Sequence, residues 1–124
     1  MSSEIIKVFF HMKLNIKMYH WSTFSYPRHK ATDELFGKLL ESIDKFVEVF
    51  IGKYTRPVIK GEGEFNIPVS QYTEDAIVTL LKTYTDYLSN ELPKHLSESD
   101  TDLLNIRDEM LADFNQTLYL FTLH

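Results

Sequence analysis

Imidazole and carboxylate side chains are the groups in this sequence whose spacing could support chemistry. The chain has five histidines and no cysteine, which excludes disulfide scaffolds, thiolate metal sites and thiol catalysis. His20 and His29 fall at the facing ends of two expected helices, and Asp33, Asp44 and Glu48 follow along the second helix. At about 100° per residue, these three carboxylates lie within roughly 60° of one another, beside the apolar stripe. Imidazole nitrogen with carboxylate oxygen suits iron, manganese or zinc, and a helical bundle holds such groups at fixed spacing.

A simpler interpretation competes with this one. Acidic residues that border the apolar face of a helix are usually only solvated, and histidines that flank a turn are more often caps or surface groups than ligands. Gly37 lies on the same strip of the second helix as the three carboxylates. His11, His95 and His124 have no partners at ligand spacing, and we expect them to be surface or cap residues.

The first helix is expected from about Ser3 to Trp21, although residues 12–18 alternate like a strand. Wound as a helix, this segment has two apolar faces, one with Val8, Phe9, Met12, Ile16 and Tyr19 and the other with Phe10, Leu14, Met18 and Trp21. Two apolar faces need two partners. One partner is the bundle itself, and the other is either a neighbouring subunit or a long loop of the same chain.

Three further helices follow from apolar periodicity and capping residues. The second is expected over residues 30–51, with Gly52 as its stop. The third is expected over residues 73–91, with Thr73 as N-cap and Pro93 ending it, and the fourth from the capping-rich stretch 99–102 to Phe121. Residues 53–71, which include Gly61-Glu62-Gly63, are expected to form a long connection between the second and third helices, either irregular or with a short strand or helix of its own. The pattern predicts an all-α, antiparallel four-helix bundle.

Length and charge restrict the class of protein. With 124 residues the chain is expected to be one domain, 1–124. A net charge of −5 is the wrong sign for a surface that attracts nucleic acid or anionic lipid. The apolar stretches are too short for a membrane span, and the start Met1-Ser2-Ser3-Glu4 is not a basic signal peptide. We therefore expect a cytoplasmic protein without membrane or nucleic-acid partners.

The order of the candidate ligands resembles the signature of the Dps branch of the ferritin-like proteins, the mini-ferritins. The matching residues are Tyr19-His20-Trp21, His29, Asp33 and Asp44-x-x-x-Glu48. His29 precedes Asp33 by four residues and Asp44 by fifteen, and Asp44 precedes Glu48 by four, as in that family. The resemblance covers about residues 8–52. The sequence is also similar to an uncharacterised viral group of such proteins, in which this region leads into Gly-Lys-Tyr, as Gly52-Lys53-Tyr54 does here.

The resemblance implies a ferritin-like bundle with a ferroxidase site between two subunits. His20, His29 and Asp33 of one chain would bind iron, as one or two ions, together with Asp44 and Glu48 of the two-fold mate. Peroxide or oxygen would oxidise Fe(II), and Trp21, as a buried aromatic, would quench oxidising equivalents that leak. The chain would form a homodimer or a larger cage, in the host cytoplasm if the protein is viral.

The sequence also departs from that family. The interval from His20 to His29 is shorter than the usual one, so the turn between the first two helices must be tighter. The lysine-rich N-terminal tail that lets some members hold DNA is absent, and so are the Glu-x-x-His pairs of the larger di-iron ferritins. Two other hypotheses therefore stay open: a metal-binding dimer clamp that holds zinc or iron without turnover, and a metal-free helical interaction protein.

Overall fold

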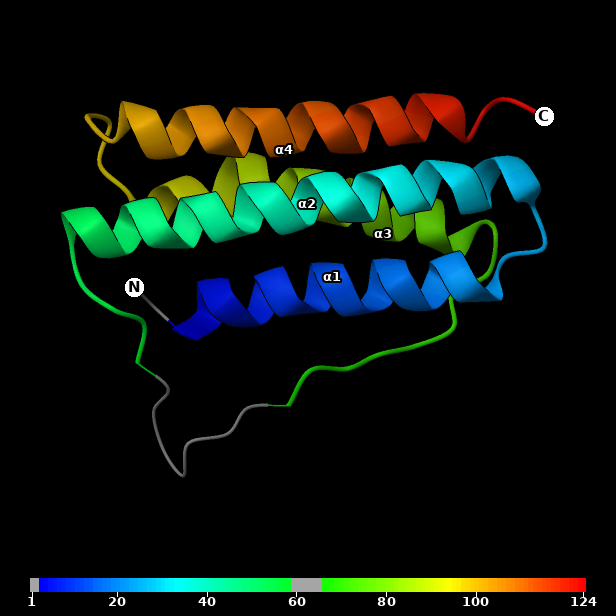
Figure 1. Cartoon of the computed structure of the whole chain (residues 1–124), viewed down its shortest axis with the longest axis horizontal. Helices are drawn as coiled ribbons and strands as arrows, with labels where there is room; N and C mark the ends of the chain where they lie inside the picture. The colour runs from blue at the N-terminus through cyan, green and yellow to red at the C-terminus, as the bar shows by residue number, and fades with distance from the viewer. Residues whose placement is uncertain (1–2, 59–65) are drawn as a thin grey trace.

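The computed structural model describes residues 3–58 and 66–124 and shows four α-helices packed side by side (Figure 1). The helices are α1 (Ser3–Ser22), α2 (Tyr26–Lys53), α3 (Ala76–Asp86) and α4 (Thr101–Leu120). A π-helical turn, η1 (Tyr87–Glu91), and a 3-10 turn, η2 (Leu92–His95), prolong α3. The described residues contain no strand, which confirms the all-helical prediction. None of the helices in this part of the chain has both the length and the apolar character that crossing a bilayer requires.

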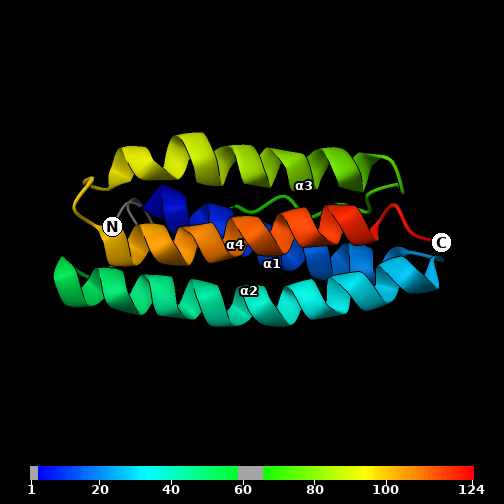
Figure 2. The ribbon, with the colours of Figure 1, turned by 90° about the horizontal axis from the view of Figure 1, so that it is seen from above.

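Neighbouring helices along the chain are antiparallel within each pair, α1 with α2 and α3 with α4, while α2 and α3 run in the same direction (Figures 1 and 2). The chain leaves α2 at one end of the bundle and enters α3 at the other. Of the connecting residues, the structure describes 54–58 and 66–75. The Gly61-Glu62-Gly63 stretch lies outside the described residues. Residues 66–75 return along α1 (Figure 1).

One apolar core joins all four helices. The first of the two faces predicted for α1 is buried at Phe9, Met12, Ile16 and Tyr19. The ring of Phe9 packs edge-on against Phe46 of α2, with 5.4 Å between ring centroids, a favourable aromatic geometry. The interior of the bundle therefore fixes how α1 and α2 are rotated relative to each other.

The second face of α1 is different. Phe10, Leu14 and Trp21 are 38%, 46% and 68% exposed. The returning segment passes elsewhere on α1, at the buried Asn15, whose amide donates to Pro68 O (2.9 Å) and accepts from Ser70 N (3.0 Å). Pro57, in the described part of the connection, lines a groove together with Phe10, so the connection reaches one end of this second face.

The predicted bounds of α2, residues 30–51, are wrong at both ends. The helix begins at Tyr26 because the Ser25 hydroxyl accepts a hydrogen bond from Arg28 N (3.3 Å) and a proline occupies the first turn. It ends at Lys53, and Gly52 lies within it in an ordinary helical conformation. The apolar periodicity that defined the prediction covers only the part of the helix that faces the core.

The last two helices also differ from expectation at their ends. The third helix was predicted to start at Thr73, but α3 begins at Ala76 and its N-cap is Asp75. The Thr73 hydroxyl accepts from Ala76 N at 3.1 Å. The α-helical part ends at Asp86 and the π-helical turn η1 ends at Glu91, where the third helix was predicted to end. Pro93 lies in the separate 3-10 turn η2. The Asp100 carboxylate does not cap α4. It binds Lys53 Nζ at 2.6 Å and accepts from the Tyr54 hydroxyl at 2.6 Å, joining the end of α2 to the start of α4.

Candidate functional site

Two of the predicted ligands meet at the turn between α1 and α2. The rings of His20 and His29 are stacked, with centroids 3.9 Å apart and planes 16° from parallel. The turn has only residues 23–25, so the short interval between the two histidines brings them together rather than apart. His20 is 6% exposed and His29 is half-buried.

Hydrogen bonds assign the same tautomer to both rings. His29 Nδ1 is 2.9 Å from the carbonyl oxygen of His20, which can only accept, so His29 Nδ1 carries the hydrogen. His20 Nδ1 is 3.1 Å from Thr32 Oγ1. The Thr32 hydroxyl already donates to Arg28 O at 2.8 Å, so it accepts from His20 Nδ1. In the neutral form of each ring the lone pair is therefore on Nε2, which is the form of imidazole that binds a metal.

The surroundings of His20 keep it neutral. Burial and the neighbouring His29 ring lower the pKa of His20 below its usual value. His20 Nε2 lies 4.0 Å from the carboxylate of Asp33, whose side chain is 67% exposed. A hydrogen bond does not span that distance, and one ion with bonds of roughly 2.1 Å would bridge the two atoms only if the exposed Asp33 side chain moved closer. The stacked rings cannot both direct their lone pairs at one such ion, because the lone pairs lie in nearly parallel planes.

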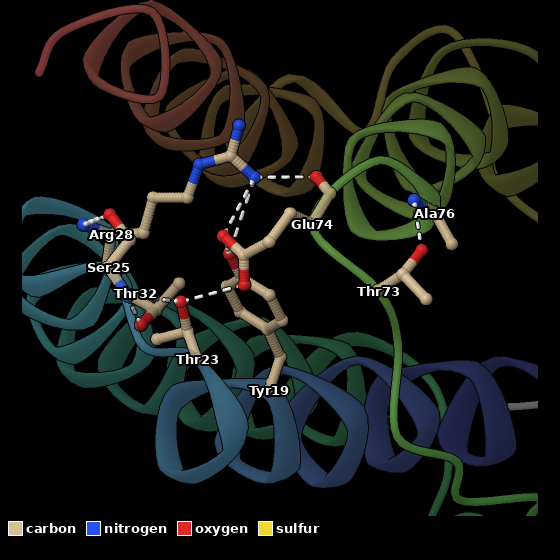
Figure 3. A network of polar contacts seen from close by, with 8 residues as sticks. All are labelled: Tyr19, Thr23, Ser25, Arg28, Thr32, Thr73, Glu74 and Ala76. Atoms are coloured by element: carbon tan, nitrogen blue, oxygen red, sulfur yellow. Dashed lines mark hydrogen bonds and ion pairs between the residues drawn. The ribbon is translucent and has the colours of Figure 1, made fainter.

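A polar network holds the turn that carries the histidines (Figure 3). The carboxylate of Glu74, at the start of the α3 region, accepts from the hydroxyls of Tyr19 (3.0 Å) and Thr23 (2.8 Å). Arg28 Nη1 donates to the backbone carbonyl of Glu74 at 2.6 Å, and its guanidinium lies 4.5 Å from the ring centroid of Phe121. This network links Tyr19, which precedes His20, and Arg28, which precedes His29, to Glu74 next to α3. The geometry of the histidine pair therefore depends on contacts among several segments at this end of the bundle.

The other two predicted ligands lie elsewhere on the same chain. Asp44 and Glu48 are exposed on α2. At 1.5 Å per residue they are about 16 and 22 Å along the helix from Asp33. Gly37 lies between them and Asp33 on the same exposed strip, and a Cβ added there would meet no atom within 4 Å. One chain therefore brings together His20, His29 and Asp33 but not the last two carboxylates.

Trp21 was expected to be a buried aromatic, and this is wrong for the single chain, where it is 68% exposed. The helix turns its indole outward, and Lys17 Nζ lies 5.6 Å from the ring centroid. Next to it, a groove of about 270 Å³ runs between α1 and α2, lined by Phe10, Lys13, Leu14, Lys17, Phe36 and Leu40. We call this surface, together with Trp21, the α1–α2 face.

The expectation for the remaining histidines holds for two of the three. His95 and His124 are exposed. His11 is half-buried, and its Nδ1 lies 2.6 Å from the hydroxyl of Tyr84 on α3. The prediction that His11 is a surface or cap residue is therefore wrong, because the two helices approach closely at this position.

Sequence reasoning missed the residues that orient the histidines. Thr32 follows His29 by three residues and so lies one helical turn away, a spacing that could have indicated it. Arg28 and Glu74 are 46 residues apart, and no local pattern links them. Within residues 3–58 and 66–124, no three histidine or acidic side chains are grouped closely enough to hold a metal ion.

Comparison with known proteins identifies a family to which the chain is similar. No curated protein and no solved structure matches the chain significantly. A family model, described as a family of unknown function (DUF5856), matches residues 20–121, from the first candidate ligand to the end of α4. The chain belongs to this family of unknown function, DUF5856.

Proposed function

We propose that two copies of the chain pair through the α1–α2 face, and that the joined surfaces bind iron and oxidise Fe(II). The observation that carries the proposal is the histidine pair, in which Nδ1 of each ring is engaged in a hydrogen bond and Nε2 is the ring nitrogen that remains for a metal ion. The arrangement of the helices, with one antiparallel pair joined to the other by a chain that runs the length of the bundle, supports a ferritin-like fold.

The chemistry of the donors suits iron as substrate. Neutral imidazole binds Fe(II), and carboxylate oxygens favour Fe(III), so a mixed set lets iron bind before oxidation and stabilises the product. Two Fe(II) ions give one electron each to peroxide, its O–O bond breaks, and two protons complete two waters. The reaction requires a supply of Fe(II), which the reducing cytoplasm provides.

Two-fold pairing accounts for the separation of the ligands along α2. When the α2 helices of two copies pair antiparallel about a two-fold axis, each residue lies opposite the one equally far from the axis on the other copy. An axis midway along α2 between Asp33 and Asp44, or between Asp33 and Glu48, therefore places Asp33 of one copy opposite that second carboxylate of the other. That midpoint falls within two residues of Leu40, which is 41% exposed beside the apolar groove of the α1–α2 face. Gly37 has no side chain on this strip, so a second helix could approach closely there. Each chain would supply one half of two equivalent sites.

Pairing would also explain the second apolar face of α1. Phe10, Leu14 and Trp21 are exposed together on one side of the bundle, and contiguous apolar patches of this kind usually mark interfaces. In the proposed dimer the indole of Trp21 becomes covered and lies next to His20, where it could take up oxidising equivalents.

The first test is an anaerobic Fe(II) titration of the full chain, followed by a peroxide pulse and recorded by ferric absorbance, together with the molar mass in solution. The proposal expects a dimer or larger assembly and rapid oxidation that saturates at about one or two irons per chain. Asp44→Asn and Glu48→Gln, both exposed in the single chain, should each abolish rapid oxidation. Glu109→Gln, an exposed position on α4, is the matched control and should behave like the original chain.

A complementation experiment tests whether the site is shared between chains. One variant carries His20→Ala and His29→Ala, and the other carries Asp44→Asn and Glu48→Gln. Neither should oxidise iron alone, but a refolded equal mixture should recover about a quarter of the sites, because half of the dimers are mixed and each holds one intact site. Oxidation by the original chain without recovery in the mixture would contradict the shared site. Metal-dependent dimerisation without oxidation would instead indicate a metal clamp, and indifference to metal would indicate a helical interaction protein.

A further inference from the structure

Gly37 lies in the interior of α2, where glycine makes a helix less stable than alanine would. Nothing in the described part of the chain requires a glycine there. The backbone has an ordinary helical conformation, and a Cβ added at Gly37 would meet no atom within 4 Å. The residue is also exposed. A bare helix surface at an exposed position permits another backbone to approach closely.

The residues around Gly37 on the outer side of α2 form a strip that combines apolar and charged side chains. At about 100° per residue, its six members fall within roughly 80° of one another. All are exposed, and they are Lys30, Asp33, Gly37, Leu40, Asp44 and Glu48. We call these six residues the α2 strip.

The proposed pairing of two α2 helices allows two positions for the two-fold axis, between residues 38 and 39 or between residues 40 and 41. Asp33 and Asp44 are 11 residues apart, close to three full turns, so their directions around the helix differ by only about 20°. The directions of Asp33 and Glu48 differ by about 60°. Because two-fold pairing of antiparallel helices matches residues of the same direction, the first axis brings its two carboxylates together more closely.

The first axis also matches the apolar part of the strip. Leu40 and Gly37 are equally far from it, so Leu40 of each copy, 41% exposed, meets the bare helix surface of the other. Leu14 and Phe36 line the same groove as Leu40, so apolar surface surrounds this axis. The second axis would instead set Leu40 at the height of an exposed carboxylate, Glu41.

The charges at the ends of the strip favour the same axis. Lys30 and Glu48 are 18 residues apart, which is five full turns, so they have the same direction around α2. With the first axis, Lys30 of one copy and Glu48 of the other differ in height by one residue, about 1.5 Å, whereas the second axis separates them by three residues. Opposite charges placed in this way fix the register of an interface.

We infer that the two-fold axis of the dimer crosses α2 between residues 38 and 39, where Leu40 of each copy packs on the partner's Gly37 and Lys30 pairs with the partner's Glu48. This inference rests on the proposed function, which requires the pairing, and it adds the register. Gly37 is then the residue that permits close contact of the two helices. Asp44, not Glu48, is the partner carboxylate that lies opposite Asp33.

Single cysteines report the register directly, because the chain has no cysteine of its own. A refolded equal mixture of Gly37→Cys and Leu40→Cys should form disulfide-linked dimers several-fold faster than Leu40→Cys alone, although only half of its dimers are mixed. The mixed pair lies at one height, whereas two copies of position 40 are about 4.5 Å apart along the helices. The axis between residues 40 and 41 gives the reverse order of rates, and that result overturns the inference.

A bulky side chain at position 37 tests the close contact. At concentrations where the chain is monomeric, Gly37→Leu should have an unchanged or higher Tm, because its side chain meets no atom of its own chain and leucine is the better helix former. The dimer Kd, measured by sedimentation, should rise about thirty-fold or more, since the added side chain strains two symmetric contacts. Glu109→Leu, which adds the same side chain at an exposed position on α4, is the matched control and should leave the Kd unchanged.

An unchanged Kd in Gly37→Leu also overturns the inference, as does an original chain that is monomeric and whose cysteine variants do not cross-link. Iron oxidation by the original chain is measured separately. Oxidation by a dimer with the wrong cross-links means that only the register is wrong, whereas a monomer that does not oxidise iron means that the proposed function has failed as well.

Discussion

Replacing Thr32 by valine should change the tautomer of His20. Thr32 is 1% exposed and its hydroxyl is the only partner of His20 Nδ1 within the described chain. Valine keeps the shape of the side chain but offers no acceptor. A buried Nδ1–H without a partner costs about 1–3 kcal/mol. His20 can avoid most of this cost by moving its hydrogen to Nε2 and donating to Asp33, which is 4.0 Å away and needs only a small approach.

The expected loss of free energy of unfolding in Thr32→Val is therefore about 1 kcal/mol, at the lower end of the range for an unpaired buried donor. With an unfolding entropy of roughly 2.1 cal/mol/K per residue over 124 residues, this corresponds to a fall in Tm of about 4 °C. The larger effect should be on metal binding, because the Nε2–H tautomer has no lone pair for an ion. Loss of such an orienting partner typically weakens metal affinity by about 10–100-fold.

The tautomer can be measured directly by imidazole nitrogen NMR, and the affinity by titration with Zn(II). Thr32→Ser is the matched control, since it keeps the hydroxyl and loses a buried methyl group, with a similar cost of about 0.8 kcal/mol. Serine should keep the Nδ1–H tautomer and the metal affinity at a similar Tm. If valine and serine give the same tautomer, the Thr32 hydroxyl does not orient His20 and our assignment of the lone pairs is wrong.

Three further predictions concern the contacts between helices. The Lys53 ammonium beside Asp100 holds the pKa of that carboxyl at about 2 rather than 3.8. The pair therefore stabilises the fold above about pH 4, and this contribution is lost as the pH falls through 2. Asp100→Asn should flatten that part of the plot of unfolding free energy against pH, measured by urea unfolding. Glu74→Ala removes the carboxylate that accepts from the buried Tyr19 hydroxyl and should lower the free energy of unfolding by about 1–3 kcal/mol, with calorimetry showing no change if the network is dispensable. Tyr84→Phe removes the 2.6 Å contact with His11 Nδ1, which keeps only the longer contact with the Asn15 amide at 3.3 Å. It should cost about 1 kcal/mol in the same assay, whereas an unchanged Tm would show that the contact contributes nothing.

Apolar periodicity was sufficient to predict the number and order of the helices, because each must bury one stripe. The ends were harder to predict. The start of α2 depends on Ser25 and the proline that follows Tyr26, which lie before the first buried residue of the stripe, Ala31. The π-helical turn after Asp86 has no periodic signature, and neither does the 3-10 turn with Pro93 that follows it. Local hydrogen bonding decides such boundaries, while the pattern records only burial.

The candidate site was also predictable from the sequence only in part. Regular helical spacing was enough to align Asp33, Asp44 and Glu48 on one strip of α2. The stacking of His20 on His29 was not predictable, because it depends on the path of a three-residue turn and on tertiary contacts that hold that turn. The exposure of the α1–α2 face likewise depends on where the chain goes after α2, which composition does not specify.

Asn15 has a consequence for how this sequence can vary. Besides donating to His11 O on its own helix, its amide donates to Pro68 O and accepts from Ser70 N, so it pairs with the passing chain as a neighbouring strand would. Recognition through the main chain is indifferent to side-chain identity. The amino acids at residues 68–70 should therefore vary among relatives as long as position 70 is not proline, whereas position 15 should remain asparagine. In this part of the molecule, the sequence should therefore be constrained at Asn15, the buried helix residue that binds the loop, whereas the side chains of the loop can change.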